Sequence, residues 1–261
     1  MMSSLIDVKK VDNHIAVITL NRPEARNALS RALLTELYTI IKEVDSDSSI
    51  HCTVLTGSGT KAFCAGADLK ERKGMPDNEV IDCVSQIGDV VTAIENMKMP
   101  VIGLVNGAAF GGGLELALGC DIRLAAGHAK MGLTETSLAI IPGAGGTQRL
   151  PRLIGMGKAK KMIFSAKAIS AEEAKEINLV EEAVSSEDLM EAGLELARTI
   201  AANGPVALMQ AKSAINHGSD IDIHNALIFE RQCYKETIPT SDRLEGLKAF
   251  QEKRKPIYKG K

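Results

Sequence analysis

The distribution of apolar residues along the chain predicts strands that alternate with helices. Residues 14–20 are apolar and β-branched, and turn-forming residues follow at 21–23, so we predict a strand at 14–20. Ser30 is a suitable helix N-cap. Apolar residues then recur at helical spacing, at Leu33, Leu34, Leu37, Ile40, Ile41 and Val44. This spacing predicts an amphipathic helix that begins after Ser30.

The same alternation continues toward the middle of the chain. Short apolar runs bounded by glycine, proline or polar residues predict buried strands at 52–56, 101–105 and 121–125. We interpret residues 61–70 as a loop that turns into a helix near Asp68. Residues 80–97 have a helical pattern that Pro100 ends.

Helices dominate the last third of the chain. Ser170 and Glu173 have the spacing of a capping box, and a short strand is predicted at 179–184. Helical periods then run from about residue 186 to 253. We therefore predict an α/β core at residues 1–195 and a helical region at 196–261 that serves as an arm or an oligomer contact.

Composition excludes several classes of protein. The chain has 261 residues, of which 45% are hydrophobic and 25% are charged, so disordered and fibrous classes are excluded. A net charge of −2 gives no general attraction to nucleic acid or anionic membranes. No signal-peptide segment precedes the first strand, and no apolar run is long enough to span a bilayer. We expect a bacterial cytoplasmic protein, with a mature mitochondrial chain as the alternative.

Signatures of metal, redox and covalent catalysis are missing. The five cysteines contain no Cys-x-x-Cys pair, so we expect reduced core residues. The histidines lack metal-ligand spacing, and neither a Gly-x-Ser-x-Gly elbow nor a phosphate-binding P-loop occurs. Residues 57–62 lack the third glycine of a dinucleotide site. A metal, a nicotinamide and a covalent serine are therefore disfavoured.

Two carboxylates beside glycine-rich turns are the best indication of chemistry. Glu115 follows three consecutive glycines, and Glu135 precedes a second glycine-rich segment at 141–148. Paired carboxylates beside exposed backbone N–H groups suit acid–base chemistry on a substrate that develops oxyanion charge. Each residue alone has a simpler explanation. Glu115 is equally well explained as stabilising a helix dipole, and Glu135 as a solvated loop residue.

Basic residues cluster at 70–73, 158–161 and 253–255. The second cluster fits a solvated helix surface, whereas the first and third are candidates for contact with phosphate groups. Aromatic residues make up only 3% of the chain and Trp is absent, so stacking platforms for single-stranded RNA are scarce.

Several motifs together resemble the crotonase superfamily, the enoyl-CoA hydratase/isomerase family. They are IAVITLNRP at 15–23, AFCAGADL at 62–69, VNGAAFGGGLEL at 105–116, CDIR at 120–123 and IIPGAGGTQRL at 140–150. The resemblance covers nearly the whole chain. It implies a spiral of ββα units, and a helical C-terminal region that builds homotrimers, often paired into hexamers.

The resemblance also implies a set of site residues for an acyl-CoA thioester. The N–H groups of Ala67 and Gly112 would form the oxyanion hole. Four consecutive residues would line the path of the CoA arm: Ala67, Asp68, Leu69 and Lys70. Arg26 would approach the CoA nucleotide, and Lys253 or a neighbour would contact its phosphates, from the same or another subunit. Coenzyme A would be part of the substrate, with no separate cofactor.

Because both glutamates are present, the resemblance implies hydration of a short-chain 2-enoyl-CoA. Glu115 would activate water and Glu135 would protonate Cα. Members that only isomerise double bonds commonly keep the residue matching Glu135 alone. An isomerase is therefore the weaker alternative.

Two further alternatives follow from the resemblance. MGLTETSLAIIP at 131–142 and TIPTSDRLEG at 237–246 are similar to methylglutaconyl-CoA hydratases of leucine degradation, and also occur in short-chain enoyl-CoA hydratases. Animal relatives of the former bind RNA through a lysine-rich helix. Here residues 70–82 alternate lysines with acidic residues, so RNA binding is disfavoured.

Overall fold

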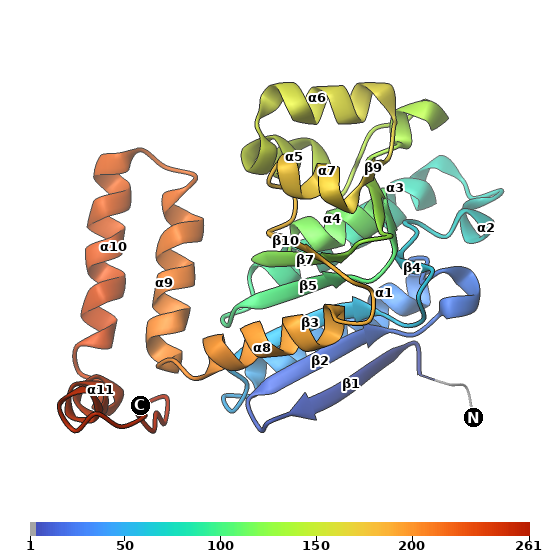
Figure 1. Cartoon of the computed structure of the whole chain (residues 1–261). Helices are drawn as coiled ribbons and strands as arrows, with labels where there is room; N and C mark the ends of the chain where they lie inside the picture. Colours follow the sequence, from blue (N-terminus) through green and yellow to red (C-terminus); the bar gives the residue numbers. More distant parts are fainter. Residues whose placement is uncertain (1–3) are drawn as a thin grey trace.

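Two β-sheets form the framework of the chain, which a computed structural model describes from residue 4 to residue 261 (Figure 1). Within these residues the larger sheet has six strands, in the order β1 (Ile6–Val11), β2 (Ile15–Leu20), β3 (Cys52–Gly57), β5 (Val101–Val105), β7 (Ile122–Ala126) and β10 (Glu182–Val184). The smaller sheet of the described chain has four, in the order β4 (Ala62–Cys64), β6 (Ala108–Phe110), β8 (Lys130–Gly132) and β9 (Ile169–Ser170). Neighbouring strands are parallel except at β1–β2 and β8–β9.

Units of two strands and a helix connect the sheets. In each unit the first strand joins the larger sheet, the second joins the smaller sheet, and helical turns follow. The successive units are β3–β4 with α2 (Leu69–Arg72) and α3 (Asp77–Glu95), β5–β6 with α4 (Gly112–Leu118), and β7–β8 with the 3-10 helix η2 (Glu135–Leu138) and α5 (Gly146–Ile154). This winding is the ββα spiral that the resemblance implied, and it confirms the predicted fold class.

Helix α1 (Arg31–Ser46) shows how the local sequence determines an element. The Ser30 side chain accepts a hydrogen bond of 3.3 Å from the N–H of Leu33, which caps the first turn. The apolar positions predicted to share one face include Leu37 and Ile41, and both are buried in the main core. The capping box of α7 (Ala171–Glu176), between Ser170 and Glu173, is likewise confirmed.

Short strands and an edge strand differ from the sequence prediction. Strand β4 lies inside the stretch predicted as a loop at 61–70, and β6 lies in the glycine-rich turn. With three residues each, they are too short to show a period. Strand β1 was missed because it lies at the sheet edge, where most of its side chains are exposed. Helix α3 begins at Asp77 rather than at residue 80.

The predicted domain boundary at residue 195 falls within α8 (Leu189–Ala201). This helix packs on the larger sheet, where Leu189 and Ala197 join the buried cluster that includes Val54 and Leu104. The chain leaves the core after α8, at Gly204. The next helix, α9 (Pro205–Gly218), begins beyond this point, and the domain boundary at residue 195 stays a prediction.

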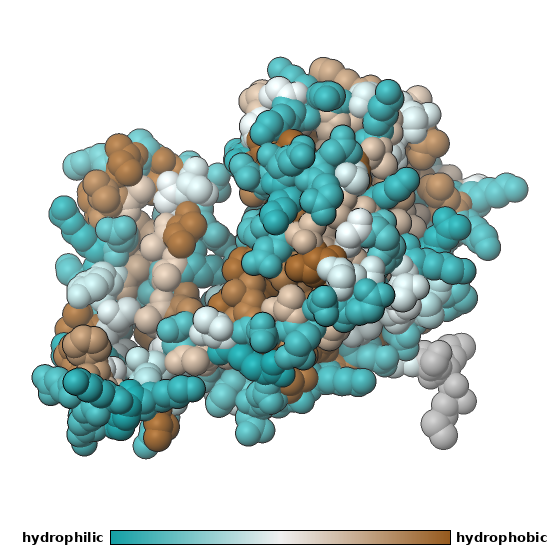
Figure 2. Space-filling model, in the orientation of Figure 1, coloured by the Kyte–Doolittle hydropathy of each residue, from teal (hydrophilic) through white to brown (hydrophobic). Residues whose placement is uncertain are grey.

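Helices α9, α10 (Ile223–Thr237) and α11 (Ser241–Gln251) extend to one side of the core (Figure 1). Lys212 of α9 is buried and pairs with Asp121 at 2.7 Å, which ties the helix to the core. Many large apolar side chains of this region are exposed, among them Ile223, Tyr234 and Phe250. Hydrophobic residues gather on these helices and on the neighbouring face of the core (Figure 2).

Two further findings concern the described residues. No helix between residues 4 and 261 is both long and apolar enough to cross a membrane. All five cysteines are free and buried, which confirms the prediction that they are core residues.

Candidate active site

Residues from three successive units meet at one edge of the smaller sheet. Strands β4, β6 and β8 are adjacent and parallel, so their carboxyl ends lie at the same edge. Ala67 follows β4, Gly112 follows β6, and Glu135 follows β8. Ligands of open α/β sheets bind outside the carboxyl ends of the strands. The winding of the chain thus brings together positions that are far apart in the sequence.

Glu115 lies on α4 and is almost fully buried, with 3% of its surface exposed. Its Oε1 accepts hydrogen bonds of 2.8 Å from the N–H groups of Ala144 and Gly146. A Cβ at Gly146 would lie 2.9 Å from this oxygen, so glycine permits the close contact. Its Oε2 accepts no hydrogen bond from residues 4–261 and remains available to a ligand.

Glu135 opens η2 and is partly buried. Its Oε2 is inaccessible to solvent and has no hydrogen-bond partner within residues 4–261. Gly111 lies beside it with a φ of 51°, and a Cβ there would lie 3.0 Å from Oε1. A buried oxygen without a partner is costly, so this carboxyl group does not stabilise the fold.

The environments of the two carboxyl groups raise their pKa values. Burial is the main cause that raises the pKa of Glu135 from 4.5 to about 7, and the charge of Glu115 adds to the rise. Burial also raises the pKa of Glu115, while its two backbone N–H donors and two neighbouring arginines oppose that rise. At neutral pH, Glu135 is therefore present in both its acidic and its basic forms, as proton transfer requires.

Two backbone N–H groups line the same cavity without acceptors. Among residues 4–261, neither the N–H of Ala67 nor that of Gly112 has a hydrogen-bond acceptor. Leu29 donates to the Gly66 carbonyl at 2.8 Å and so fixes the segment that carries Ala67. Gly66 has a φ of 93°, and a Cβ there would lie 2.7 Å from the Phe110 carbonyl. Only glycine at position 66 allows the segment after β4 to approach the end of β6 so closely.

The cavity that these groups share has a volume of about 160 Å³. Apart from the two glutamates and the glycine-rich turns, its walls are mostly apolar, formed by Leu69, Val84, Ile87, Phe110, Leu138, Ile140 and Ile141. Leu138 and Ile141 are largely exposed at its entrance. A small apolar chamber with two carboxylates and two free N–H donors suits a short acyl group attached to a polarised carbonyl.

A model of a protein family described as enoyl-CoA hydratase/isomerase matches residues 10–261. The chain belongs to this family. The solved structure of an enoyl-CoA hydratase from Bacillus anthracis is similar with a TM-score of 0.98 and 52% sequence identity, covering 99% of this chain and all of that one. These values show that the fold and the placement of its motifs are those of the family.

Two curated relatives carry more specific names. The mitochondrial methylglutaconyl-CoA hydratase of Mus musculus is 49% identical over 250 residues, covering 94% of this chain and 80% of the relative. The short-chain-enoyl-CoA hydratase of Clostridium acetobutylicum is 45% identical over 244 residues, covering 94% of each protein. Both relatives are named as hydratases of CoA compounds.

The residues predicted to line the CoA path lie on or beside the site. Asp68 caps α2 by accepting from Lys70 N at 3.1 Å, and it pairs with Arg22 at 3.1 Å, so its carboxylate has a structural role. Leu69 lines the cavity, and Lys70 is exposed on the next turn. The carbonyl of Arg26 accepts from Ala65 N at 3.0 Å, close to the segment that carries Ala67. The CoA contacts of these residues stay predictions.

Lys253 is not brought to this site within one chain. It follows α11, which lies on the opposite side of the molecule from α2 (Figure 1). A contact between Lys253 and CoA would therefore involve the site of another subunit, which was one of the predicted arrangements.

Some features of the site were not identified from the sequence. The segment at 141–148 was recognised as glycine-rich, but its hydrogen bonds to Glu115 were not predicted. Arg72 was assigned only to a basic cluster, yet it lines the cavity. Its position shortly after the AFCAGADL motif was a signal in the sequence, but Lys70 and Lys73 share that position.

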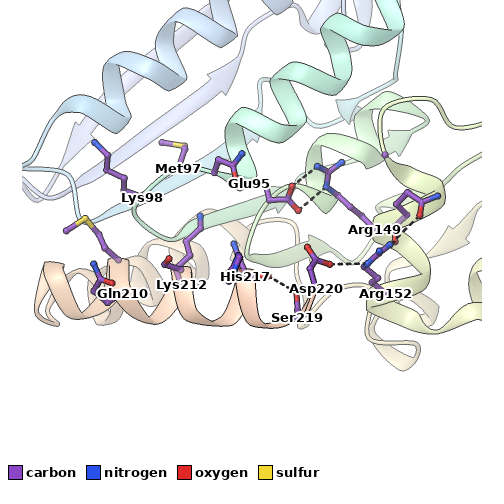
Figure 3. Close-up of a pocket in the computed structure, with 16 residues that line it drawn as sticks. Glu95, Met97, Lys98, Arg149, Arg152, Gln210, Lys212, His217, Ser219 and Asp220 are labelled. Carbon is purple, nitrogen blue, oxygen red and sulfur yellow. Dashed lines mark hydrogen bonds and ion pairs between the residues drawn. The ribbon is translucent and has the colours of Figure 1, made fainter. Parts of the chain in front are cut away.

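A larger groove, of about 910 Å³, lies between the core and α9, and neither Glu115 nor Glu135 lines it. Figure 3 shows Glu95 paired with Arg149, and Arg152 paired with Asp220, across its walls. Lys212 also lies in this groove. Within residues 4–261, no group of three His, Cys, Asp or Glu side chains is placed to hold a metal ion, in this groove or elsewhere.

Proposed function

We propose that the protein adds water across the 2,3 double bond of a short-chain trans-2-enoyl-CoA thioester. The observation that carries this proposal is the cavity in which Glu115 and Glu135 each present an oxygen that no described residue hydrogen-bonds. Hydration requires one group to activate water and another to protonate carbon. The membership of the family supports the acyl-CoA substrate.

The proposed reaction uses the two free N–H groups first. The thioester oxygen accepts from Ala67 and Gly112, and this polarises the double bond toward an enolate. One oxyanion donor lowers the barrier by about 3–4 kcal/mol. The CoA arm leaves the cavity past Leu69 and Lys70, as predicted from the resemblance.

The two carboxyl groups then divide the proton transfers. Glu115, oriented by Ala144 and Gly146, accepts a proton from water as the oxygen attacks Cβ. Glu135 gives its proton to Cα, for which a pKa near neutrality is suitable. Proton exchange with solvent returns both groups to their starting states. The addition is redox-neutral, so we propose no cofactor beyond the CoA of the substrate.

Isomerisation is the weaker candidate because it moves a proton within the substrate and consumes no water. A single carboxyl group suffices for that reaction. Glu115 is buried and hydrogen-bonded, and burying a carboxylate costs free energy of folding. Isomerisation gives this second carboxylate no role, whereas hydration uses it to activate water, so Glu115 favours hydration.

Crotonyl-CoA and 3-methylglutaconyl-CoA provide the test. We expect the absorbance of the conjugated thioester to decrease with at least one of them, and the product to gain the mass of one water. A product of unchanged mass would indicate an isomerase. No reaction with either substrate, in a folded protein that binds CoA, would refute the proposed hydration.

We also propose that the protein forms a homotrimer or a dimer of trimers through α9–α11. The exposed apolar side chains of these helices support this, because such surfaces are costly in water. Light scattering gives the test, and a monomer at micromolar concentration would contradict the proposal. We also propose a cytoplasmic location, with a mature mitochondrial chain as the alternative, and an acyl-CoA thioester rather than nucleic acid or a membrane as the partner.

A further inference from the structure

Arg72 is the positively charged residue among the described residues that line the catalytic cavity. It is the last residue of α2 and is partly buried. Asp68 fixes the start of this short helix, and the N–H of Arg72 donates to the Asp68 carbonyl at 3.0 Å. The backbone around the arginine is therefore anchored close to the oxyanion segment.

The guanidinium of Arg72 has no partner within residues 4–261. No ion pair and no side-chain hydrogen bond is formed by it, although Glu115 and Glu135 line the same cavity. Most arginines of the described chain behave differently. Arg22 and Arg149, for example, each pair with a carboxylate. The Arg72 nitrogens are not among the buried polar atoms without a partner, so solvent reaches them, and the five donors are suited to a planar anion.

The geometry of the proposed reaction indicates which part of the substrate this arginine meets. The thioester oxygen lies at the N–H groups of Ala67 and Gly112, and Cβ lies at Glu115. The positive charge of Arg72 acts on Glu115, where it opposes the rise in that group's pKa. Because Arg72 lines the same cavity as both glutamates, a short acyl group held there can present its far end to the guanidinium.

We propose that Arg72 binds a carboxylate at the far end of the acyl group, so that the preferred substrate is a short 2-enoyl-CoA with an acidic acyl chain. This inference rests on the proposed hydration. A purely hydrocarbon chain gives the guanidinium no partner, whereas a terminal carboxylate accepts two parallel hydrogen bonds from it. The apolar side chains of Val84 and Ile87 line the same cavity and suit the carbon chain between the two ends.

The phosphates of CoA are the other anions that could reach an arginine. The whole pantetheine arm separates them from the thioester, while Arg72 shares a cavity with both catalytic glutamates. The acyl carboxylate is therefore the better match, and the experiment separates the two.

The test compares Arg72→Gln with the unaltered protein on paired substrates. Crotonyl-CoA lacks the terminal carboxylate, which glutaconyl-CoA and 3-methylglutaconyl-CoA carry. We expect the unaltered protein to prefer at least one acidic substrate, and Arg72→Gln to lower kcat/KM for it about 30- to 1,000-fold relative to crotonyl-CoA. The ratio of the two substrates cancels any effect on Glu115 that is common to both. Arg72→Lys should recover part of the ratio, because it restores the charge without the planar donor pair.

Two controls make the outcome decisive. Arg31→Gln removes an arginine that pairs with Glu79 on the surface, and should leave the ratio unchanged. Thioesters of pantetheine, which lack the nucleotide, should show the same loss in Arg72→Gln if the acyl carboxylate is the ligand.

Three results would overturn the inference while leaving the hydration intact. They are crotonyl-CoA turnover without turnover of acidic substrates, an equal loss on both kinds of substrate, and a loss that disappears with pantetheine thioesters. Absence of hydration with every substrate would refute the proposed function itself.

Discussion

Glu95 on α3 and Arg149 on α5 form an ion pair with two hydrogen bonds, of 3.1 and 2.6 Å. Nη1 of Arg149 also donates to the carbonyl of Ala144 at 3.2 Å, and the N–H of Ala144 holds Glu115. The pair thus supports the turn that orients the proposed water-activating carboxylate. The positive charge of Arg149 also opposes the rise of the pKa of Glu115.

Arg149→Met is expected to reduce kcat about 10- to 100-fold by misplacing Glu115, and to move the acidic limb of the pH profile to higher pH. The second effect arises because loss of the positive charge raises the pKa of Glu115 further. Steady-state rates of hydration across the pH range measure both. Arg152→Met, one turn along the same helix, is the matched control and should change neither. A fall in rate that is equal at every pH would show that Arg149 acts on the fold alone.

Glu135→Gln is expected to lower kcat for hydration about 100- to 10,000-fold, because the amide cannot give a proton to Cα. Folding and CoA binding should persist, since Glu135 Oε2 has no partner in the described chain that the substitution would remove. The measurement is the loss of thioester absorbance, with binding of a saturated acyl-CoA as the control. Full activity in this variant would exclude Glu135 as the acid.

The same substitution should stabilise the protein in a pH-dependent manner. The pKa of Glu135 is raised from 4.5 to about 7 in the folded state, so the folded protein binds more protons than the unfolded chain between these values. Its contribution to the free energy of unfolding is present below about pH 4.5 and is lost as the pH rises through about 7. Gln carries no such charge. The Tm of Glu135→Gln minus that of the unaltered protein should therefore increase from about pH 5 to about pH 8. A constant difference would contradict the raised pKa.

Lys212→Met should lower the free energy of unfolding by about 3 kcal/mol, because it leaves the buried side of Asp121 without its cation. The pair measures 2.7 Å, and Lys212 also donates to the carbonyl of Met99 at 3.2 Å. Combining it with Asp121→Asn should restore part of the loss, since the charge left unpaired is then removed. Urea denaturation of the single and double variants gives the comparison. If Lys212→Met were as stable as the unaltered protein, hydration of the Asp121 carboxylate by solvent would already be sufficient without the lysine.

The local sequence predicted those elements whose cause is local. Ser30 and the apolar spacing after it were sufficient for α1, and the glycines beside Glu115 and Glu135 identified both carboxylates. The contact between Glu115 and Gly146 was not predictable in the same way, because it joins two helices whose packing depends on the whole fold. The absence of a partner for Arg72 among residues 4–261 is also a property of its neighbours in space. Among neighbouring basic residues in the sequence, it has no distinguishing mark.

The short strands were missed for a related reason. Three residues at 62–64 or 108–110 cannot show a period, and their pairing depends on strands that are distant in the chain. The spiral itself came from the family resemblance and not from the spacing of apolar residues.

Because β4, β6 and β8 are adjacent and parallel, three separate segments of the chain each supply a different part of the site. The N–H donors come from the segments after β4 and β6, whereas Glu135 and the entrance residues Leu138 and Ile141 all come from the segment after β8. Exchanging that last segment would change the proposed proton donor and the cavity entrance together. The donors to the thioester oxygen would stay in place. One scaffold can therefore acquire a new reaction by altering a single loop.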